Sequence, residues 1–257
     1  GWQIQIQKIP LAMAATIGFF LAGLLVMFLL FNHDIFHWTH EELYIKGSKT
    51  FDEVLNIKHD FLNMTTFWIF FVIIAGSCLI LTYKWWSTLT AMDTNPSRKL
   101  FSSSRVIAAV TIVIISFVIN TFATWLWSMS IQPHWFSTMF TWNTMASACV
   151  TALSIIMLFI QYLKSKGYLE HVDTSHIHDL AKFMFGISIF WTYLWFSQFM
   201  LIWYSNIPEE VTYFVTRIEH YKLPFFGMLA LNFIFPLLIL INTDFKRLTW
   251  IVVMAGI

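Results

Sequence analysis

The sequence predicts an all-α fold, a polytopic transmembrane helix bundle that forms a single transmembrane domain over residues 1–257. Two observations lead to this class. Hydrophobic residues make up 58% of the chain and charged residues only 11%, whereas a soluble domain carries about 25% charged residues. The apolar residues also gather in long runs, without the alternation in polarity that the strands of a membrane barrel require.

Six apolar runs are each long enough to cross the hydrocarbon core, which needs about 20 residues of helix. Apolar side chains surround each run on every side, which excludes surface helices with one apolar stripe. A further run begins a seventh span and stops with the chain, so we expect the chain to be part of a longer protein. The predicted spans are 9–32, 61–83, 105–129, 140–163, 180–204 and 223–242, with 248–257 as the partial seventh.

The charged residues between the spans predict the orientation. The N-terminus and every second loop carry ten Lys and Arg residues together, and the opposite side carries five. Cytoplasmic loops carry the excess of positive charge, so we expect the N-terminus in the cytoplasm. The outer loop 33–60 is the longest, and it is acidic and aromatic. We expect it to cover part of the outer face or to meet a partner.

The cysteine and histidine residues argue against a resident metal or haem. Cys78 and Cys149 both lie inside apolar runs, so the sequence has no CxxC or CxxCH motif. All nine His residues fall in loops or at span ends, whereas a b-type haem inside a bundle needs axial ligands within the spans. The sequence therefore predicts no metal and no covalently bound cofactor, and a net charge of +1 gives no sign of a nucleic-acid partner.

A polar stripe along the fifth span is the strongest candidate for a functional site. Steps of three or four residues place its members on one helical face. Polar groups in a membrane are costly and usually face a bundle interior or a water cavity, which favours a proton path or a quinone pocket. The alternative is that the end residues anchor the helix at the interface and the others pack against neighbouring helices. The stripe comprises His178, Lys182, Gly186, Tyr193, Ser197 and Tyr204, with Gln198 beside it.

Titratable residues near the span ends are weaker candidates. Glu209 and Glu210 follow the fifth span, either as solvated surface carboxylates or as a proton exit or docking patch. His59 and Asp60 form a titratable pair before the second span, and His134 lies in a loop without Lys or Arg.

Proline in the sixth span predicts an irregular helix. Pro236 should kink the helix or free a carbonyl, because it has no N–H to donate. Asn232 lies one turn earlier and is placed to satisfy a freed backbone group. No other span has a mid-span proline, which counts against a transporter built from broken repeats.

The segment from His178 to Glu210, HDLAKFMFGISIFWTYLWFSQFMLIWYSNIPEE, resembles a known family. It is similar to the NrfD/PsrC-like membrane subunits of alternative complex III, a quinol:cytochrome c oxidoreductase, and is most like the second such subunit. The run WFSQFMLIWYSNIPEE is long and chemically unusual, and the TYFVTRIEH and NFIFPLLIL that follow are also similar. The earlier spans agree in hydropathy and order.

The resemblance implies a subunit of about ten membrane-spanning helices in a bacterial inner (cytoplasmic) membrane. Its complex oxidises menaquinol or another quinol and passes electrons to cytochrome c or to a terminal oxidase. The implied partners are a second NrfD-like membrane subunit, multihaem cytochrome c subunits and an iron–sulfur subunit, which hold the haem c and Fe–S centres. The NrfD-like subunits contribute quinol pockets or proton paths and hold no metal.

The matching segment also implies roles for its residues. His178 and Asp179 would admit protons from the cytoplasm, and histidine suits this role because its unperturbed pKa is about 6.5. Tyr193 and Gln198 would line the interior. The implied path or pocket residues are His178, Asp179, Lys182, Tyr193, Ser197, Gln198, Tyr204, Glu209 and Glu210.

Three classes of function are therefore open. The first is a subunit of a redox complex that binds quinol or moves protons without a redox centre. The second is a secondary transporter or channel-like membrane protein. The third is a structural anchor for extrinsic subunits, in which case the polar stripe would tolerate apolar replacement.

Overall fold

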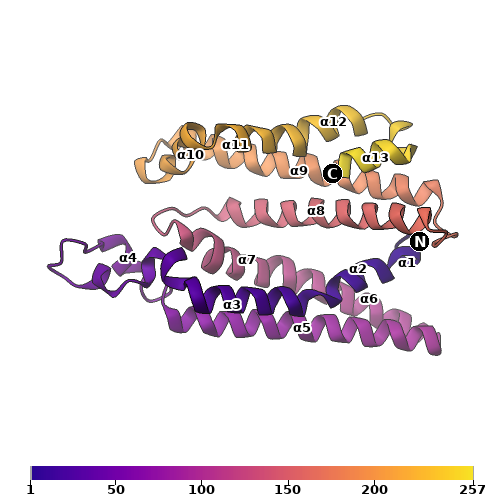
Figure 1. Cartoon of the computed structure of the whole chain (residues 1–257), viewed down its shortest axis with the longest axis horizontal. Coiled ribbons are helices and arrows are strands. Elements are labelled where there is room, and N and C mark those ends of the chain that lie inside the picture. Colours follow the sequence, from indigo (N-terminus) through magenta and orange to yellow (C-terminus); the bar gives the residue numbers. More distant parts are fainter. Residues whose placement is uncertain (1, 257) are drawn as a thin grey trace. The chain divides into compact units, whose positions relative to one another are not determined.

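The computed structural model describes residues 2–256, and the chain is 83% helical, with no strand in this described part. Six of its helices are long and apolar enough to cross a membrane (Figure 1). They cover Lys8–Ile35, Met64–Thr94, Arg98–Ile131, Thr138–Ser165, Thr174–Ser205 and Lys222–Leu240. The sequence prediction of an all-α, multi-pass membrane protein is confirmed.

The predicted spans match these helices, and most of the helices extend beyond the apolar runs, whereas the sixth ends at Leu240, two residues before its predicted end. The second span was expected to end at residue 83, and its helix continues to Thr94. The added turns contain Lys84 and Asp93, so the helix continues through sequence that is too polar for the hydrocarbon core. The start of the seventh run forms a helix over Thr249–Gly256, while residue 257 lies outside the described part.

The described chain divides into two compact units, and each contains three of the long helices. The N-terminal unit is Leu11–Phe136, and the C-terminal unit is Gly1–Pro10 with Ser137–Ile257. Helix α2 (Lys8–Ala15) crosses the boundary between the units.

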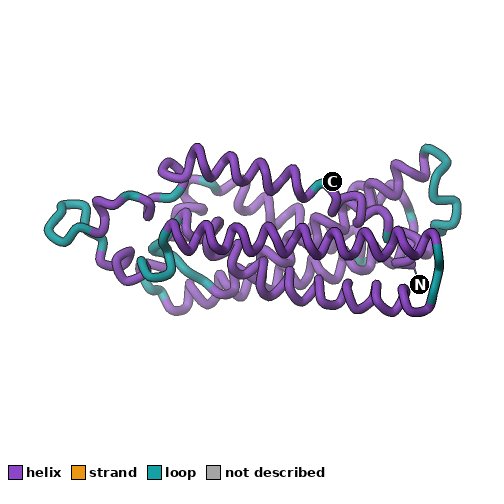
Figure 2. Tube along the Cα trace, turned by 90° about the horizontal axis from the view of Figure 1, so that it is seen from below, coloured by secondary structure: helices purple, strands orange, loops and turns teal. Residues whose placement is uncertain are grey.

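The N-terminal unit is held by aromatic packing at one end of its helices. Phe28 and Phe67 are almost fully buried, with ring centroids 5.0 Å apart in an edge-to-face arrangement, a geometry that adds to the gain from burial. Figure 2 shows the α3–α5 connection as short helices joined by loop. The elements are α3 (Ile17–Ile35), η1 (His37–Thr39), η2 (Glu41–Tyr44), α4 (Glu53–Lys58), α5 (Met64–Thr94), α6 (Arg98–Val113), η3 (Ile114–Ile119), α7 (Asn120–Ala123), η4 (Thr124–Ser128) and η5 (Met129–Ile131).

The C-terminal unit is built around the antiparallel pair α8 and α9. A turn with Gly167 at φ +82° follows α8, and Asp173 with His176 forms a capping box at the start of α9, which satisfies the first free N–H groups. Asn206 ends α9 in the left-handed conformation. The elements are α1 (Trp2–Ile6), α8 (Thr138–Ser165), α9 (Thr174–Ser205), α10 (Pro208–His220), α11 (Lys222–Leu229), η6 (Ala230–Ile234), α12 (Phe235–Leu240), η7 (Phe245–Arg247) and α13 (Thr249–Gly256).

The sixth span is irregular where the sequence predicts it. A π-helical segment, η6, precedes Pro236, and Pro236 has no N–H for the carbonyl of Asn232 four residues earlier. The Ser188 hydroxyl of α9 donates a hydrogen bond to this carbonyl. The Asn232 side chain instead donates to the carbonyl of Met228 at 3.0 Å. The group that satisfies the freed carbonyl is therefore a serine on the neighbouring helix, which the sequence did not reveal.

We expect Ser188→Ala to lower the free energy of unfolding by about 1–3 kcal/mol, because it leaves a buried carbonyl without a donor. Thr216→Ala is the control, since its hydroxyl bonds a carbonyl within the exposed face of α10. The measurement is thermal or denaturant unfolding of the purified protein in detergent. Adding Pro236→Ala to Ser188→Ala supplies a backbone N–H and should recover part of the loss. Additive losses in the double variant would contradict this account.

Candidate functional site

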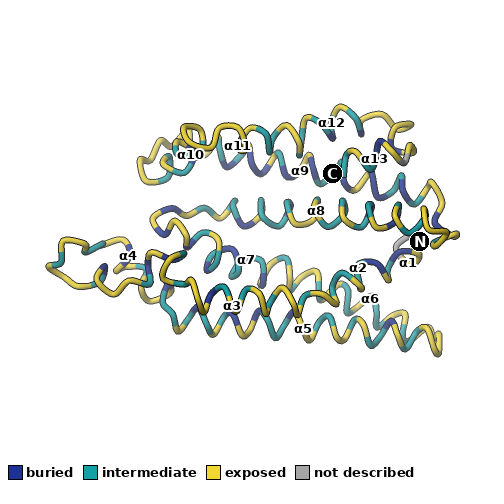
Figure 3. Tube along the Cα trace, in the orientation of Figure 1, coloured by how far each residue is buried: buried dark blue, intermediate teal, exposed yellow. Residues whose placement is uncertain are grey.

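Helix α9 has one face packed inside the C-terminal unit and another that is exposed on it. Ala181, Ser188 and Trp191 lie on the packed face and are buried. Buried and exposed positions both occur along α9 (Figure 3). The predicted stripe lies on the other face, where Tyr193 and Tyr204 are 63% and 86% exposed. The stripe therefore faces the surroundings of the unit, and its members are spread along the helix and not gathered in one pocket.

The first turns of α9 carry three of the predicted residues. Lys182 Nζ lies 2.7 Å from Asp179 Oδ1, and both side chains remain partly exposed. The Nε2 atom of His178 is buried and has no hydrogen-bond partner among the described residues. The structure thus brings His178, Asp179 and Lys182 together at one end of the helix, as the sequence predicts for adjacent helical turns.

The far end of α9 places the other predicted carboxylates on a separate helix. Glu209 and Glu210 occupy the first turn of α10, and Arg217 and His220 occupy its last turns. This distribution complements the helix dipole, with acids at the N-terminus and bases at the C-terminus. The two carboxylates therefore have a structural role at the start of α10. This role is independent of the predicted role of Glu209 and Glu210 at the outer end of a proton path.

Tyr193 lines an open groove on the exposed side of the C-terminal unit. The groove has a volume of about 430 Å³ and lies between α9 and the segment formed by α11 and η6. Its walls are almost entirely apolar. Thr192, Tyr193 and Trp195 are the lining residues that carry a polar side-chain atom, and the Thr192 hydroxyl already donates to the carbonyl of Ser188 at 2.9 Å. The lining residues are Ile189, Thr192, Tyr193, Trp195, Phe196, Leu229, Phe233 and Ile234.

The buried interface between α8 and α9 contains unsatisfied amide groups. Trp191 Nε1 donates to Ser147 Oγ at 2.6 Å, which fixes the antiparallel register of the two helices. Asn143 lies four residues before Ser147 and Gln198 lies seven after Trp191, so both lie on the contact faces and toward the same end. Gln198 is 3% exposed, and neither its Nε2 nor Asn143 Oδ1 has a hydrogen-bond partner among the described residues. The pair offers a donor and an acceptor to a hydroxyl group or water.

A second, polar cavity of about 230 Å³ lies where α8, α9, η6, α12 and α13 meet. Thr151 and Ser154 of α8 line it together with Ser188 and Asn232. A polar cavity of this size is large enough for several water molecules, each of which needs two or more polar partners. This cavity and the α8–α9 amides place polar chemistry inside the unit. Gln198 was a candidate for this interior from the sequence, but Asn143 and Ser188 were not.

The polar residues of α8 were not among the candidates from the sequence. Asn143, Ser147, Thr151 and Ser154 follow each other at intervals of four, four and three residues, which is one helical face. The sequence therefore contained the signal. Its meaning depended on knowing that this face of α8 packs against α9.

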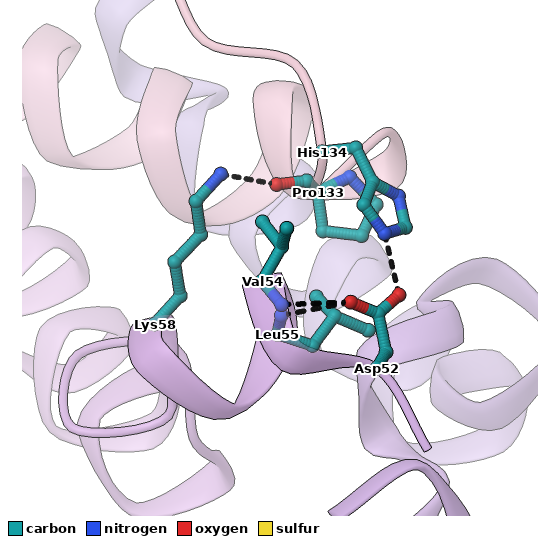
Figure 4. Close-up of polar contacts among 6 residues, drawn as sticks. All are labelled: Asp52, Val54, Leu55, Lys58, Pro133 and His134. Carbon is teal, nitrogen blue, oxygen red and sulfur yellow. Dashed lines mark hydrogen bonds and ion pairs between the residues drawn. The ribbon is translucent and has the colours of Figure 1, made fainter. Parts of the chain in front are cut away.

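In the N-terminal unit, a cluster outside the spans joins two loops (Figure 4). Asp52 Oδ1 accepts hydrogen bonds from the backbone N–H groups of Val54 and Leu55 and so caps α4, while Asp52 Oδ2 lies 2.5 Å from His134 Nε2. Lys58 Nζ donates to the carbonyl of Pro133 at 2.5 Å. These contacts link the α3–α5 connection to the loop before α8. His134 was a candidate from the sequence, but its partner Asp52 is 82 residues away and was not.

The charges of this cluster shift the pKa values of its members. Burial opposes ionisation of Asp52, but the N–H groups of Leu55 and Val54 and the His134 ring together hold its pKa below the ordinary value of 3.8. Burial lowers the pKa of Lys58, and the nearby Asp52 carboxylate acts in the opposite direction. The Asp52 carboxylate is therefore ionised at neutral pH. We call the contacts of Asp52 and Lys58 with the loop at Pro133 and His134 the latch.

No model of a known protein family matches the chain, and no curated protein matches it. Among residues 2–256, no three His, Cys, Asp or Glu side chains are placed to hold a metal ion. The fold and the site together define a class of protein: a helical membrane protein with an apolar groove and a polar interior. The particular function is inferred from that chemistry and from the resemblance of the His178–Glu210 segment.

We expect the latch to stabilise the loops at neutral pH and to weaken in acid. Since the Asp52 pKa is lowered on folding, its contribution is present above pH 3.8 and is lost as the pH falls through that value and the lower folded value. Asp52→Ala should cost about 1 kcal/mol at pH 7 through the lost cap, and the difference from wild type should shrink as the pH falls through 3.8 and the lower folded value. Asp52→Asn keeps the cap and should lose less.

Limited proteolysis of the 33–60 segment at several pH values measures this effect. Asp60→Asn is the matched control, because Asp60 lies on the same segment and its carboxylate takes part in no described hydrogen bond or ion pair. An unchanged cleavage rate in Asp52→Ala at pH 7 would contradict the latch.

Proposed function

We propose that this chain is a membrane subunit of a quinol-oxidising respiratory complex of the alternative complex III type. It would lie in a bacterial inner membrane with its N-terminus in the cytoplasm, bind menaquinol or another quinol or conduct protons, and hold no redox centre of its own. One observation carries the proposal. The segment that resembles the NrfD-like subunits also forms one wall of the open apolar groove at Tyr193.

The chemistry of the groove suits a quinol. Ligand sites typically have volumes of about 300–1,000 Å³ and apolar walls with a few polar groups, and the groove at Tyr193 has about 430 Å³. The rings of Trp195 and Phe196 offer flat apolar surface, and the Tyr193 hydroxyl offers a hydrogen bond to a quinol oxygen. Tyr193 and Phe196 are both more than half exposed, so a ligand from the lipid phase can reach them.

The interior of the C-terminal unit supplies polar groups that can hold water molecules, through which protons can move. Oxidation of a quinol releases two electrons and two protons, and the electrons must pass to haem c or Fe–S centres in partner subunits. The unpartnered amides of Gln198 and Asn143 and the polar cavity at Ser188 are separate places where waters can be held. Together with His178 at the other end of α9, they mark positions for a proton path along this helix.

The implied partners are a second NrfD-like membrane subunit, multihaem cytochrome c subunits, an iron–sulfur subunit and a terminal oxidase. Phospholipid would contact the remaining exposed apolar surface. The exposed stripe on α9 supports a role in assembly as well, because an exposed polar and aromatic face inside a membrane favours another protein surface over lipid.

A secondary transporter or channel is the second candidate, and one observation favours it. The third long helix of each unit contains π-helical turns, at η3 and η4 in the N-terminal unit and at η6 in the C-terminal unit. Transporters often place broken helices at corresponding positions of two repeats. Uptake of a solute into liposomes by the chain alone would support this candidate.

We expect Tyr193→Phe in the assembled complex to lower kcat/KM for quinol roughly threefold to tenfold, because one hydrogen bond to the ligand is lost. Ile189→Trp, which fills the groove, should cause a larger loss. The control is Tyr221→Phe, which removes the same hydroxyl from an exposed tyrosine outside the groove and outside the predicted stripe.

The measurement is steady-state quinol oxidation with cytochrome c as acceptor. Gln198→Leu should reduce proton release while the groove remains intact. Unchanged quinol oxidation and proton release in Tyr193→Phe, Ile189→Trp and Gln198→Leu would contradict the quinol function. That result would favour a structural anchor for extrinsic subunits.

A further inference from the structure

A cluster of cationic side chains surrounds the beginning of α9 in the C-terminal unit. Lys246, in the short helix η7, is only 8% exposed. Its Nζ lies 4.6 Å from the centroid of the Phe185 ring, and no hydrogen bond or ion pair joins this ammonium to another described residue. Phe185 lies two helical turns after His178 on α9, so η7 packs along the first turns of that helix.

The surrounding charges have the same sign. Lys182, Arg247 and Lys246 all act electrostatically on the ring of His178. Asp179 is the acidic group that acts on the same ring, and it is already paired with Lys182 at 2.7 Å. Lys246 and Arg247 therefore lack a carboxylate partner among residues 2–256.

The Lys246 side chain is mostly buried, and an ammonium that loses part of its hydration without gaining a counter-charge is unfavourable. The face of the Phe185 ring offsets part of this cost through a cation–π interaction. It does not reduce the repulsion from Arg247 and Lys182. His178 Nε2 is a buried atom without a hydrogen-bond partner among the described residues. An anion placed among these groups would satisfy all of them at once.

The position of the cluster indicates which kind of molecule would supply the anion. It lies at the ends of α9 and α13, where helices of membrane character begin (Figure 1). Trp250 of α13 and Tyr168 in the α8–α9 turn are both more than 60% exposed near this end, and exposed Trp and Tyr are typical of the headgroup level. Basic pockets between helices at this level suit the phosphate of an anionic lipid.

We propose that Lys246, Arg247 and His178 bind the phosphate of an anionic phospholipid at the start of α9. Arg247 supplies a planar pair of N–H donors that fits two phosphate oxygens, and Lys246 supplies a point charge beneath them. The His178 Nε2 atom supplies a further donor. This site does not depend on the proposed quinol function, because it uses neither the groove nor the α8–α9 amides.

The test uses the purified protein in detergent, stripped of lipid and then supplied with defined lipids. Dioleoylphosphatidylglycerol and cardiolipin are the anionic probes, dioleoylphosphatidylcholine is the neutral probe, and inorganic phosphate is the free anion. Native mass spectrometry counts bound lipid, and the thermal unfolding midpoint reports stabilisation. We expect anionic lipids to remain bound and to raise the midpoint by several degrees over the neutral lipid, with no comparable effect of millimolar inorganic phosphate.

Two substitutions remove the site with little change in shape. Lys246→Met keeps an unbranched apolar side chain in the buried position, and Arg247→Gln alters an exposed residue that should not affect folding. Each should weaken anionic-lipid binding about tenfold, and Lys246→Met should leave stability in the neutral lipid unchanged or higher. Lys166→Met is the control, since Lys166 lies after α8 over the Tyr162 ring and outside the cluster.

Three results would overturn the site. The first is wild-type preference for anionic lipid in both Lys246→Met and Arg247→Gln. The second is an equal loss in Lys166→Met, which would indicate general surface charge. The third is equal stabilisation by inorganic phosphate, which would place a free anion in the cluster in place of a lipid.

Discussion

The structure depends on one constraint, that every backbone polar group inside a membrane must find its partner within the protein. Long apolar helices meet this constraint by themselves, which is why the described residues of this chain form helices and no strands. The sixth span cannot meet this constraint alone, because Pro236 within it has no N–H to donate. The freed carbonyl of Asn232 is satisfied by Ser188 of α9, so a break in one helix becomes an attachment to its neighbour. The polar cavity beside this contact follows from the same break.

The two faces of helix α9 therefore have different roles. Its packed face holds the C-terminal unit together through Trp191, Ser188 and apolar neighbours. Its exposed face carries Tyr193 and the groove. In a soluble protein, polarity tells which face is exposed. In a membrane both faces can be apolar, so neither face is marked by hydropathy alone. A polar stripe in such a helix indicates contact with something other than lipid, either an internal cavity or a partner protein.

Hydropathy predicted the spans because length and composition alone decide whether a helix can cross a bilayer. Pro236 likewise predicted the irregular turn. The candidate site was predicted only in part. The sequence selected Tyr193, Gln198 and His178, but the pairing of Asp52 with His134 and the burial of Lys246 depend on contacts between distant segments. The division into two units had no signal either, because the boundary between Phe136 and Ser137 falls in a short connection between the third and fourth spans, with no long linker to mark it.

The central claim, membership of a quinol-oxidising complex, is tested most directly by purifying the chain through an affinity tag in a mild detergent. A visible spectrum and mass spectrometry of the product are the measurement. The account predicts reduced c-type haem bands and comigrating multihaem cytochrome, iron–sulfur and second NrfD-like subunits. A colourless preparation that contains this chain alone, from a membrane in which quinol oxidation by such a complex is active, would contradict it and would favour the transporter.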